Sequence, residues 1–161
     1  MTDPFTVVRI TTFADRAEAV VDCPEPVRTA GWPGLADAAL QLLPGLVEHD
    51  CRNDVGAPFI TELGDTELAH LFEHVAIELR LLAGAHRRLS GETTWNFKRD
   101  GQRRFRVRME TRGDGRAWVE AFKGAEAVLQ WLTAGSPHDA EAAGGEPNVD
   151  AIVAKVRAAA R

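Results

Sequence analysis

The sequence predicts one small α+β domain, in which strand pairs and three main helices follow in the order ββ-α-α-ββ-α. Residues 5–11 and 16–22 are rich in β-branched and apolar residues, and the short gap between them suits a turn. Residues 103–109 alternate apolar and basic side chains, which is typical of a half-buried strand. Apolar residues recur at helical spacing over 34–43 and 65–83. Because strands and helices come in separate groups, we expect antiparallel strand pairs.

The composition is that of an ordinary globular protein. Of the 161 residues, 45% are hydrophobic and 27% are charged, which excludes wholesale disorder. No run reaches about 18 apolar residues, so we expect no membrane contact. The N-terminus lacks the basic region and apolar run of a signal peptide. Together with the presence of only two cysteines, this predicts a cytoplasmic protein with free thiols.

The first elements are a hairpin and a helix. Residues 5–11 and 16–22 form the expected strands, with the turn at 13–15. The CPEP run at 23–26 breaks regular structure, because proline can continue neither a helix nor a strand ladder. A helix follows over 34–43, and its apolar positions are Leu35, Ala38, Ala39 and Leu42.

A long connection over 45–64 shows little periodicity and carries His49 and Cys51. Loops of this length in a small domain are often functional, although a plain surface connection has the same pattern. His49 and Cys51 are therefore candidates for a site. The alternative is a hydrogen-bonded loop histidine and a buried thiol.

The clearest helix signal covers 65–83. Asp65 or Thr66 is suited to cap its start, and Gly84 follows its end. The residues of its predicted apolar face are Leu68, Leu71, Phe72, Val75, Leu79 and Leu82.

The polar side of this helix carries a motif with metal-binding chemistry. His70 and His74 are four residues apart, about 6 Å along the axis, so both imidazoles can bind one ion. Glu78 continues their row, and Glu73 lies roughly 60° round the helix from His70. This is the H-x-x-E-H arrangement of inverted zincins, in which histidines bind Zn²⁺ and the glutamate is the base. The alternative is an ordinary solvated polar face.

The predicted zinc site needs a third ligand. Glu78 is the nearest candidate, but one straight helix rarely presents three ligands at tetrahedral angles. His49 or Cys51, from the 45–64 connection, is geometrically freer. The expected catalytic base is Glu73. The expected metal ligands are His70, His74 and Glu78, with His49 as the alternative third ligand.

The second half of the domain is predicted to contain another hairpin and a closing helix. Residues 86–100 read as a loop, and 103–109 as a strand. An Asp-Gly pair marks a turn at 111–115, after which 116–122 forms the expected return strand. The closing helix covers 123–132.

The chain divides into a domain and a tail. The domain is expected to cover 1–134. Residues 135–148 are rich in Ala, Gly, Glu and Pro and are predicted to form a flexible linker. A short amphipathic helix follows over 149–161. Its apolar stripe is expected to dock either on its own domain or on a partner, including a second copy of the chain.

Charge is unevenly spread along this acidic chain. The formal net charge is −5, yet 98–116 holds eight basic and three acidic residues and is therefore +5. Arg104, Arg106 and Arg108 form a basic strip, which we expect to bind carboxylate groups of a substrate. The alternative is the solvated face of a hairpin. The overall acidity argues against nucleic acid as a partner.

Two segments resemble one known family. Residues 43–51, LPGLVEHDC, resemble the "LPGL-x-EH-x-C" signature of the N-terminal domain of cyanophycin synthetase. Residues 70–84, HLFEHVAIELRLLAG, resemble the "H-x-x-EHVALELQ-x-LAG" helix of that domain. The order and spacing also match, and the whole resemblance extends roughly over 5–134.

The resemblance implies a function in cyanophycin metabolism. In the family this domain precedes an ATP-grasp ligase and a Mur-like ligase, which build a poly-aspartate backbone with arginine on each side chain. The N-terminal domain helps to bind the polymer, and in some members it carries a metallopeptidase-like site. The resemblance implies that the residues of this site are His70, Glu73 and His74. Glu78 and His49 also match motif positions.

Two functions follow as hypotheses. The first is a zinc-dependent hydrolase that cuts amide bonds of a cyanophycin-like or related Asp/Arg peptide. The second is a non-catalytic module that binds the polymer or a separate ligase. Gly31, Gly34 and Gly45 lack the spacing of a phosphate-binding loop, so we expect no ATP and no ligase activity from this chain alone.

Overall fold

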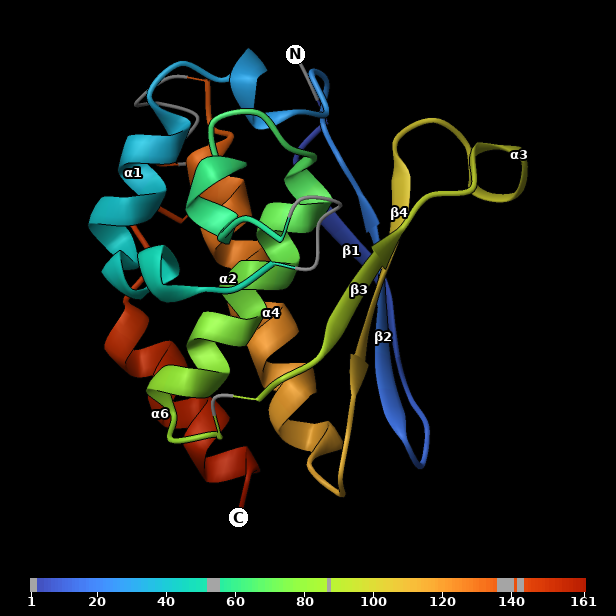
Figure 1. Ribbon diagram of the computed structural model, residues 1–161, viewed down its shortest axis with the longest axis vertical. Coiled ribbons are helices and arrows are strands. Elements are labelled where there is room, and N and C mark those ends of the chain that lie inside the picture. Colours follow the sequence, from blue (N-terminus) through green and yellow to red (C-terminus); the bar gives the residue numbers. More distant parts are fainter. Residues whose placement is uncertain (1–2, 52–55, 87, 136–140, 142–143) are drawn as a thin grey trace.

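The computed structural model, drawn in Figure 1, describes residues 3–51, 56–86, 88–135, 141 and 144–161. Within these residues one four-stranded antiparallel sheet, in the order β1-β2-β4-β3, is covered on one face by the longer helices. The predicted α+β class is therefore confirmed. The strands are β1 (Thr6–Thr12), β2 (Arg16–Asp22), β3 (Gly91–Thr94) and β4 (Arg104–Glu110). The helices are α1 (Leu35–Leu42), α2 (Leu68–Leu82), α3 (Phe97–Asp100), α4 (Gly115–Leu132) and α6 (Val149–Ala159).

The N-terminal hairpin forms as the sequence predicts. Phe13 N–H donates to the carbonyl of Arg16 at 2.7 Å and closes the turn between β1 and β2. The register shifts between Val7 and Arg9, which marks a β-bulge. There the N–H of Val7 donates to the carboxylate of Glu126 in α4. The bulge thus ties this edge of the sheet to the helical layer.

β4 is a strand as predicted, but its partners differ from the prediction. Phe105, Val107 and Met109 are buried against the helices, which confirms the alternation. The return strand predicted over 116–122 is wrong, because these residues form the first turns of α4. β4 pairs instead with β2 on one side and β3 on the other. The helix predicted over 123–132 is the remainder of α4.

The strand prediction failed at 116–122 because the apolar residues of this seven-residue segment fit both the two-residue period of a strand and the 3.6-residue period of a helix. Trp118 and Phe122 are four residues apart and both are fully buried, which is the spacing of one helix face. The preceding Asp114 accepts from the N–H of Arg112 and stands at the N-cap position of α4. The predicted loop over 86–100 is also wrong in part, since it contains β3 and α3.

The central helix α2 begins later than its sequence suggests. The predicted cap at Asp65 or Thr66 is wrong, because Glu67 stands at the N-cap. Thr66 is held by a neighbouring segment: its carbonyl accepts from the N–H of Thr29 at 2.7 Å, and its N–H donates to Thr29 Oγ1 at 3.0 Å. Arg28 and Glu67 form an isolated bridge beside this pair. These contacts hold the chain extended up to the first turn of α2.

α6 packs on its own domain. Val153 and Val156 are buried, and Ile152 meets α4 at Gly124. A Cβ on Gly124 would lie 2.4 Å from Cγ2 of Ile152, so only glycine permits this close approach. The apolar stripe of α6 therefore docks on its own domain, with Val153 and Val156 buried and Val149 and Ile152 half-buried. Of the predicted linker 135–148, residues 136–140 and 142–143 lie outside the described residues.

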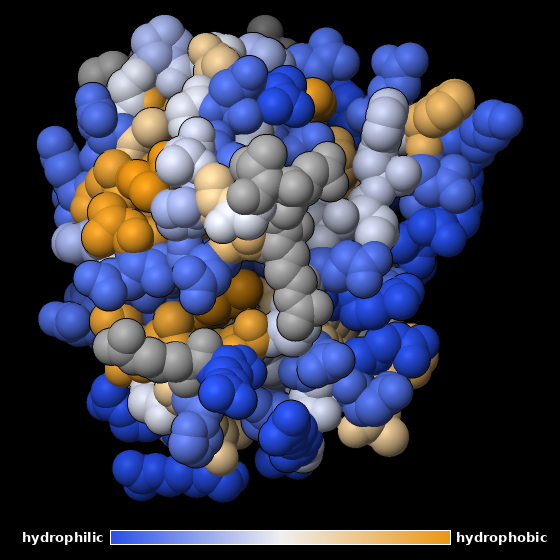
Figure 2. Space-filling model, viewed as in Figure 1, coloured by the Kyte–Doolittle hydropathy of each residue, from blue (hydrophilic) through white to orange (hydrophobic). Residues whose placement is uncertain are grey.

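The long connection before α2 holds two short 3-10 turns. They are η2 (Pro44–Glu48) and η3 (Phe59–Thr61), and both lie beside α2. Figure 2 shows hydrophilic side chains over most of this side of the molecule, with apolar side chains gathered near α1. Among the described helices, none is long and apolar enough to cross a membrane.

Candidate metal and hydrolase site

A cavity of about 1370 Å³ lies along α2, between the η2 connection and strand β3. It brings together residues that are distant in the sequence. All the residues that the sequence singles out for metal binding, base catalysis and the site loop line this cavity. They are His49, Cys51, His70, Glu73, His74 and Glu78.

Three of these residues form a group with metal-ligand geometry. The Sγ atom of Cys51 and one ring nitrogen each of His70 and His74 lie within 4.8 Å of one another. Zn–S bonds of ~2.3 Å and Zn–N bonds of ~2.0 Å place two ligand atoms roughly 3.5 Å apart on a tetrahedral ion, which fits within this limit. A thiolate with two imidazoles is also a donor set that suits Zn²⁺. The residues present therefore fit a zinc ion.

Hydrogen bonds set which nitrogen of His70 carries its proton. Thr66 Oγ1 lies 2.9 Å from Nδ1 of His70 and 3.4 Å from the carboxylate of Glu67. The tautomer of His70 with its proton on Nδ1 suits both contacts, because Thr66 then accepts from His70 and donates to the carboxylate of Glu67. Nε2 then keeps its lone pair and faces Sγ of Cys51 at 3.4 Å. The free lone pair points at the thiol that completes the group.

A second set of contacts concerns the nitrogen of His74 that carries its proton. Its Nδ1 lies 3.0 Å from Nδ1 of His49, whose Nε2 lies 3.1 Å from Oε1 of Glu78. In the tautomer of His49 with its proton on Nε2, toward the carboxylate, Nδ1 of His49 accepts from Nδ1–H of His74. The lone pair of His74 is thereby placed on Nε2. All three side chains are buried, and such outer partners orient metal-binding imidazoles.

Phe59 fixes the planes of the two ligand rings. Its ring stacks on His74 with centroids 3.8 Å apart and planes tilted by 14°, and it meets His70 edge-on at 5.2 Å. Burial lowers the pKa of His74 to about 2, helped by the nearby His70 and His49. Burial also lowers the pKa of His70. Both rings therefore stay neutral at physiological pH, the form that binds a metal.

Glu73 lies on the same helix, between the two histidines and strand β3. Thr93 Oγ1 donates to its carboxylate, and a Cβ on Gly91 would lie 2.9 Å from its Oε1. Burial raises the pKa of Glu73 to about 7, although the bond from Thr93 opposes this shift. A buried carboxylate of this pKa is suited to take up a proton near neutral pH.

The thiol of Cys51 holds its proton at physiological pH. Burial raises its pKa to about 12, and its hydrogen bond to Glu62 adds to the shift. Because a coordinated thiol is deprotonated outright, zinc binding at this position releases a proton.

The sequence pattern of one protein family, the cyanophycin synthase-like N-terminal domain, matches residues 19–129. This stretch includes the η2 connection, the whole of α2 and the cavity-lining strand β3. The chain belongs to the cyanophycin synthase-like N-terminal domain family. The resemblance predicted from the two sequence signatures is thus confirmed.

A cyanophycin synthetase of Geminocystis herdmanii (strain PCC 6308) is similar over part of the chain. The two are 40% identical over 53 residues, which is 32% of this chain and 6% of that protein. The chain therefore matches only a small part of this much longer relative.

In this member of the cyanophycin synthase-like N-terminal domain family, Glu78 and His49 lie next to the group of Cys51, His70 and His74 rather than within it. His49 contacts His74, and Glu78 contacts His49. Gly45, in the LPGL signature, makes room for this arrangement, because a Cβ there would lie 1.9 Å from Oε2 of Glu78. Spacing on one helix could not show this, since both contacts reach across to the η2 connection.

Several residues of the site were missed by sequence reasoning. Thr66 precedes His70 by one helical turn, which is a usable signal for a side-chain contact. Thr93 and Gly91 gave no such signal, because their segment was read as loop rather than as the strand that faces Glu73. Phe59 was also missed, although it packs directly on both histidines.

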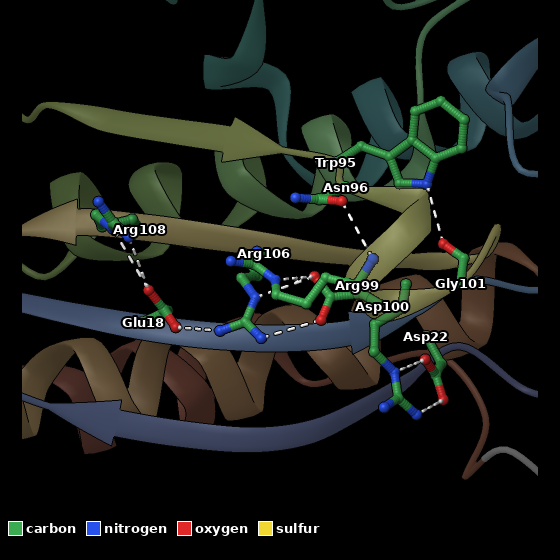
Figure 3. Close-up of polar contacts among 10 residues, drawn as sticks. Glu18, Asp22, Trp95, Asn96, Arg99, Asp100, Gly101, Arg106 and Arg108 are labelled. Carbon is green, nitrogen blue, oxygen red and sulfur yellow. Dashed lines mark hydrogen bonds and ion pairs between the residues drawn. The ribbon is translucent and has the colours of Figure 1, made fainter.

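The basic strip of this family member is paired with acids, as Figure 3 shows. Arg104 donates to both oxygens of Asp22 at 2.7 and 3.0 Å. Arg106 donates to Asp100 and to Glu18, and Glu18 also accepts from Arg108 at 3.3 Å. The charge of the strip is therefore matched by carboxylates of β2 and α3.

The cavity has the opposite charge balance. Nine carboxylate residues and three arginines stand among the described residues of its lining. The acids are Asp15, Glu48, Asp50, Glu62, Glu67, Glu73, Glu78, Glu92 and Glu110, and the arginines are Arg16, Arg88 and Arg108. Such a lining favours cationic groups of a ligand.

Proposed function

We propose that this chain is a metal-dependent amide hydrolase of metallopeptidase type, which acts on a cyanophycin-like Asp/Arg peptide. The observation that carries the proposal is the convergence of Cys51, His70 and His74 within 4.8 Å in a cavity that Glu73 also lines. This combination of a metal-ligand set and a buried carboxylate is typical of metal-assisted hydrolysis.

The ligands of the proposed Zn²⁺ are Cys51, His70 and His74, so Cys51 replaces Glu78 as the preferred third ligand. When bound, the ion supplies Lewis-acid chemistry at an amide carbonyl. Glu73 takes up a proton at its carboxylate from the water that attacks the amide carbonyl. It later gives this proton to the leaving amine. Thr93 holds one oxygen of Glu73 in place, and His49 holds the ring of His74.

The proposed substrate follows from the family and from the charge of the cavity. Cyanophycin carries an arginine on each aspartate of its backbone, and the excess of carboxylates in the lining suits those guanidinium groups. The paired arginines of the basic strip are less suited to this role. The free thiols of Cys23 and Cys51 are in keeping with a cytoplasmic site of action, which is part of the proposal.

Metal content and cleavage test the proposal together. We expect about one equivalent of zinc in the purified protein and none in the His70→Ala/His74→Ala variant, measured by elemental mass spectrometry. Glu73→Gln should keep the zinc but lose cleavage of arginyl-polyaspartate. Glu146→Gln is the control, because Glu146 is an exposed carboxylate outside the lining residues of the cavity. Cleavage that persists in Glu73→Gln would rule the mechanism out.

A non-catalytic module that binds the polymer or a separate ligase is the second candidate. The observation that favours it is an exposed aromatic pair at the end of β3. The ring centroids of Trp95 and Phe97 lie 5.6 Å apart, and the two residues are 53% and 52% exposed. Aromatic faces of this kind can stack on guanidinium groups. Polymer binding that survives chelation, with no cleavage by the zinc-loaded protein, would favour this function over the first.

A further inference from the structure

Strand β3 is an edge of the sheet that the described residues form. In the part of the chain that the structure describes, β3 pairs with β4 alone. The other edge, β1, carries a bulge, and its Val7 N–H is covered by Glu126. β3 is a short strand of four residues with one charged side chain, Glu92, and it has neither a bulge nor a lysine or proline.

The ladder shows which backbone groups face the open side. The N–H of Glu110 donates to the carbonyl of Ser90 at 3.1 Å, so Ser90 and Glu110 form a hydrogen-bonded pair. Hydrogen-bonded pairs alternate along an antiparallel ladder, so Glu92 and Thr94 also bond to β4. The N–H and C=O groups of Gly91 and Thr93 therefore point away from β4. None of the described residues forms a hydrogen bond with these groups.

These free groups lie in the wall of the candidate site. Residues on both faces of β3 line the cavity: Gly91 and Thr93 face α2, and Glu92 and Thr94 face the other way. Since both faces line the same cavity, the cavity includes the edge between them. The same two residues adjoin Glu73, through the bond from Thr93 and the close approach of Gly91.

We propose that the open edge of β3 binds the backbone of an extended peptide segment with guanidinium-bearing side chains by strand addition. The groups of Gly91 and Thr93 form the hydrogen bonds, which places a peptide bond of the ligand beside Glu73. The excess of carboxylates in the cavity supplies the charge complementarity for its side chains. This inference rests on the proposed function, which it extends by naming how the substrate is held.

Amide hydrogen exchange on the full chain tests the proposal, with arginyl-polyaspartate oligomers as the probe and Glu73→Gln protein to prevent cleavage. We expect the amides of Gly91 and Thr93 to exchange about tenfold more slowly with the probe than without it. Glu92 and Thr94 should not change, because β4 already protects their amides. This alternation is a signature that binding elsewhere in the cavity does not produce.

A pair of variants isolates the backbone N–H. Thr93→Val and Thr93→Pro both lose the hydroxyl, but only the proline also loses the N–H, and proline is tolerated at an open edge. We expect Thr93→Pro to bind the probe about fivefold more weakly than Thr93→Val, the effect of one hydrogen bond. Circular dichroism verifies that both variants fold.

The outcomes separate this inference from the proposed function. Equal binding by the two variants, or unchanged exchange at Gly91 and Thr93 while the wild type cleaves the probe, overturns the edge proposal alone. Protection of both amides without cleavage by zinc-loaded wild type supports the edge proposal and overturns the hydrolase. No binding of the probe overturns the edge proposal.

Discussion

Nδ1 of His49 lies 3.0 Å from Nδ1 of His74, so one of the two imidazoles must donate to the other. When His49 carries one proton, the carboxylate of Glu78 accepts it from Nε2, so Nδ1 of His49 is the acceptor. His74 therefore donates, and its Nε2 is left with a lone pair. The carboxylate of Glu78, which is linked to the proposed metal only through His49 and His74, thus sets which nitrogen of His74 carries the proton.

His49→Ala is expected to weaken zinc binding while all three proposed ligands remain. Loss of a partner that orients a ligating histidine lowers metal affinity roughly 10- to 100-fold. Competition with a chromophoric chelator measures the change. His86→Ala is the matched control, since His86 is exposed after the end of α2 and should leave the affinity unaltered. Equal affinities of the two variants would show that His49 does not orient His74.

Gly45→Ala is expected to destabilise the protein. The new Cβ would lie 1.9 Å from Oε2 of Glu78, so the buried Glu78–His49 contact has to shift, at a cost of about 1–3 kcal/mol. Urea denaturation measures the free energy of unfolding. Gly64→Ala serves for comparison, because no atom lies within 4 Å of its added Cβ. A Gly45→Ala protein as stable as Gly64→Ala would contradict the predicted collision.

The contact between α4 and α6 predicts a compensating pair of substitutions. Gly124→Ala alone should cost about 1–3 kcal/mol, because its Cβ would collide with Ile152. Adding Ile152→Ala removes Cγ2 of Ile152, the nearest colliding atom, so the double variant should be more stable than the sum of the single effects predicts. Thermal unfolding of the four proteins of the cycle gives the coupling. Strict additivity would place α6 elsewhere.

Acid should weaken the attachment of α3 to β4. Hydrogen bonds from Arg106 lower the pKa of Asp100 from 3.8 to about 2, and Arg99 adds to the shift. A carboxyl group with a lowered pKa stabilises the folded state above its unfolded pKa, and this contribution is lost as the pH falls through about 2. Asp100→Asn should therefore be less stable than wild type at pH 7, with a smaller difference near pH 2. Urea denaturation measures the difference in stability at both pH values. An equal difference at pH 7 and near pH 2 would contradict the prediction.

Local pattern was sufficient for much of the fold. The hairpin of β1 and β2, the helix α1 and the alternation of β4 all follow from hydrophobic periodicity within a few residues. The segment 116–122 failed because its apolar residues suit a strand and a helix equally over so short a span. Burial of Trp118 and Phe122 on one face settled the question only in the packed molecule.

The sequence by itself determined that His70, Glu73 and His74 share one side of a helix, since helical geometry depends only on residues a turn apart. Only the tertiary structure decided that Cys51 joins the histidines and that Glu78 stands behind His49. It also decided that β3 closes the cavity beside Glu73. The reason is physical: these contacts join segments separated along the chain, and they form only where burial of the shared core brings those segments together.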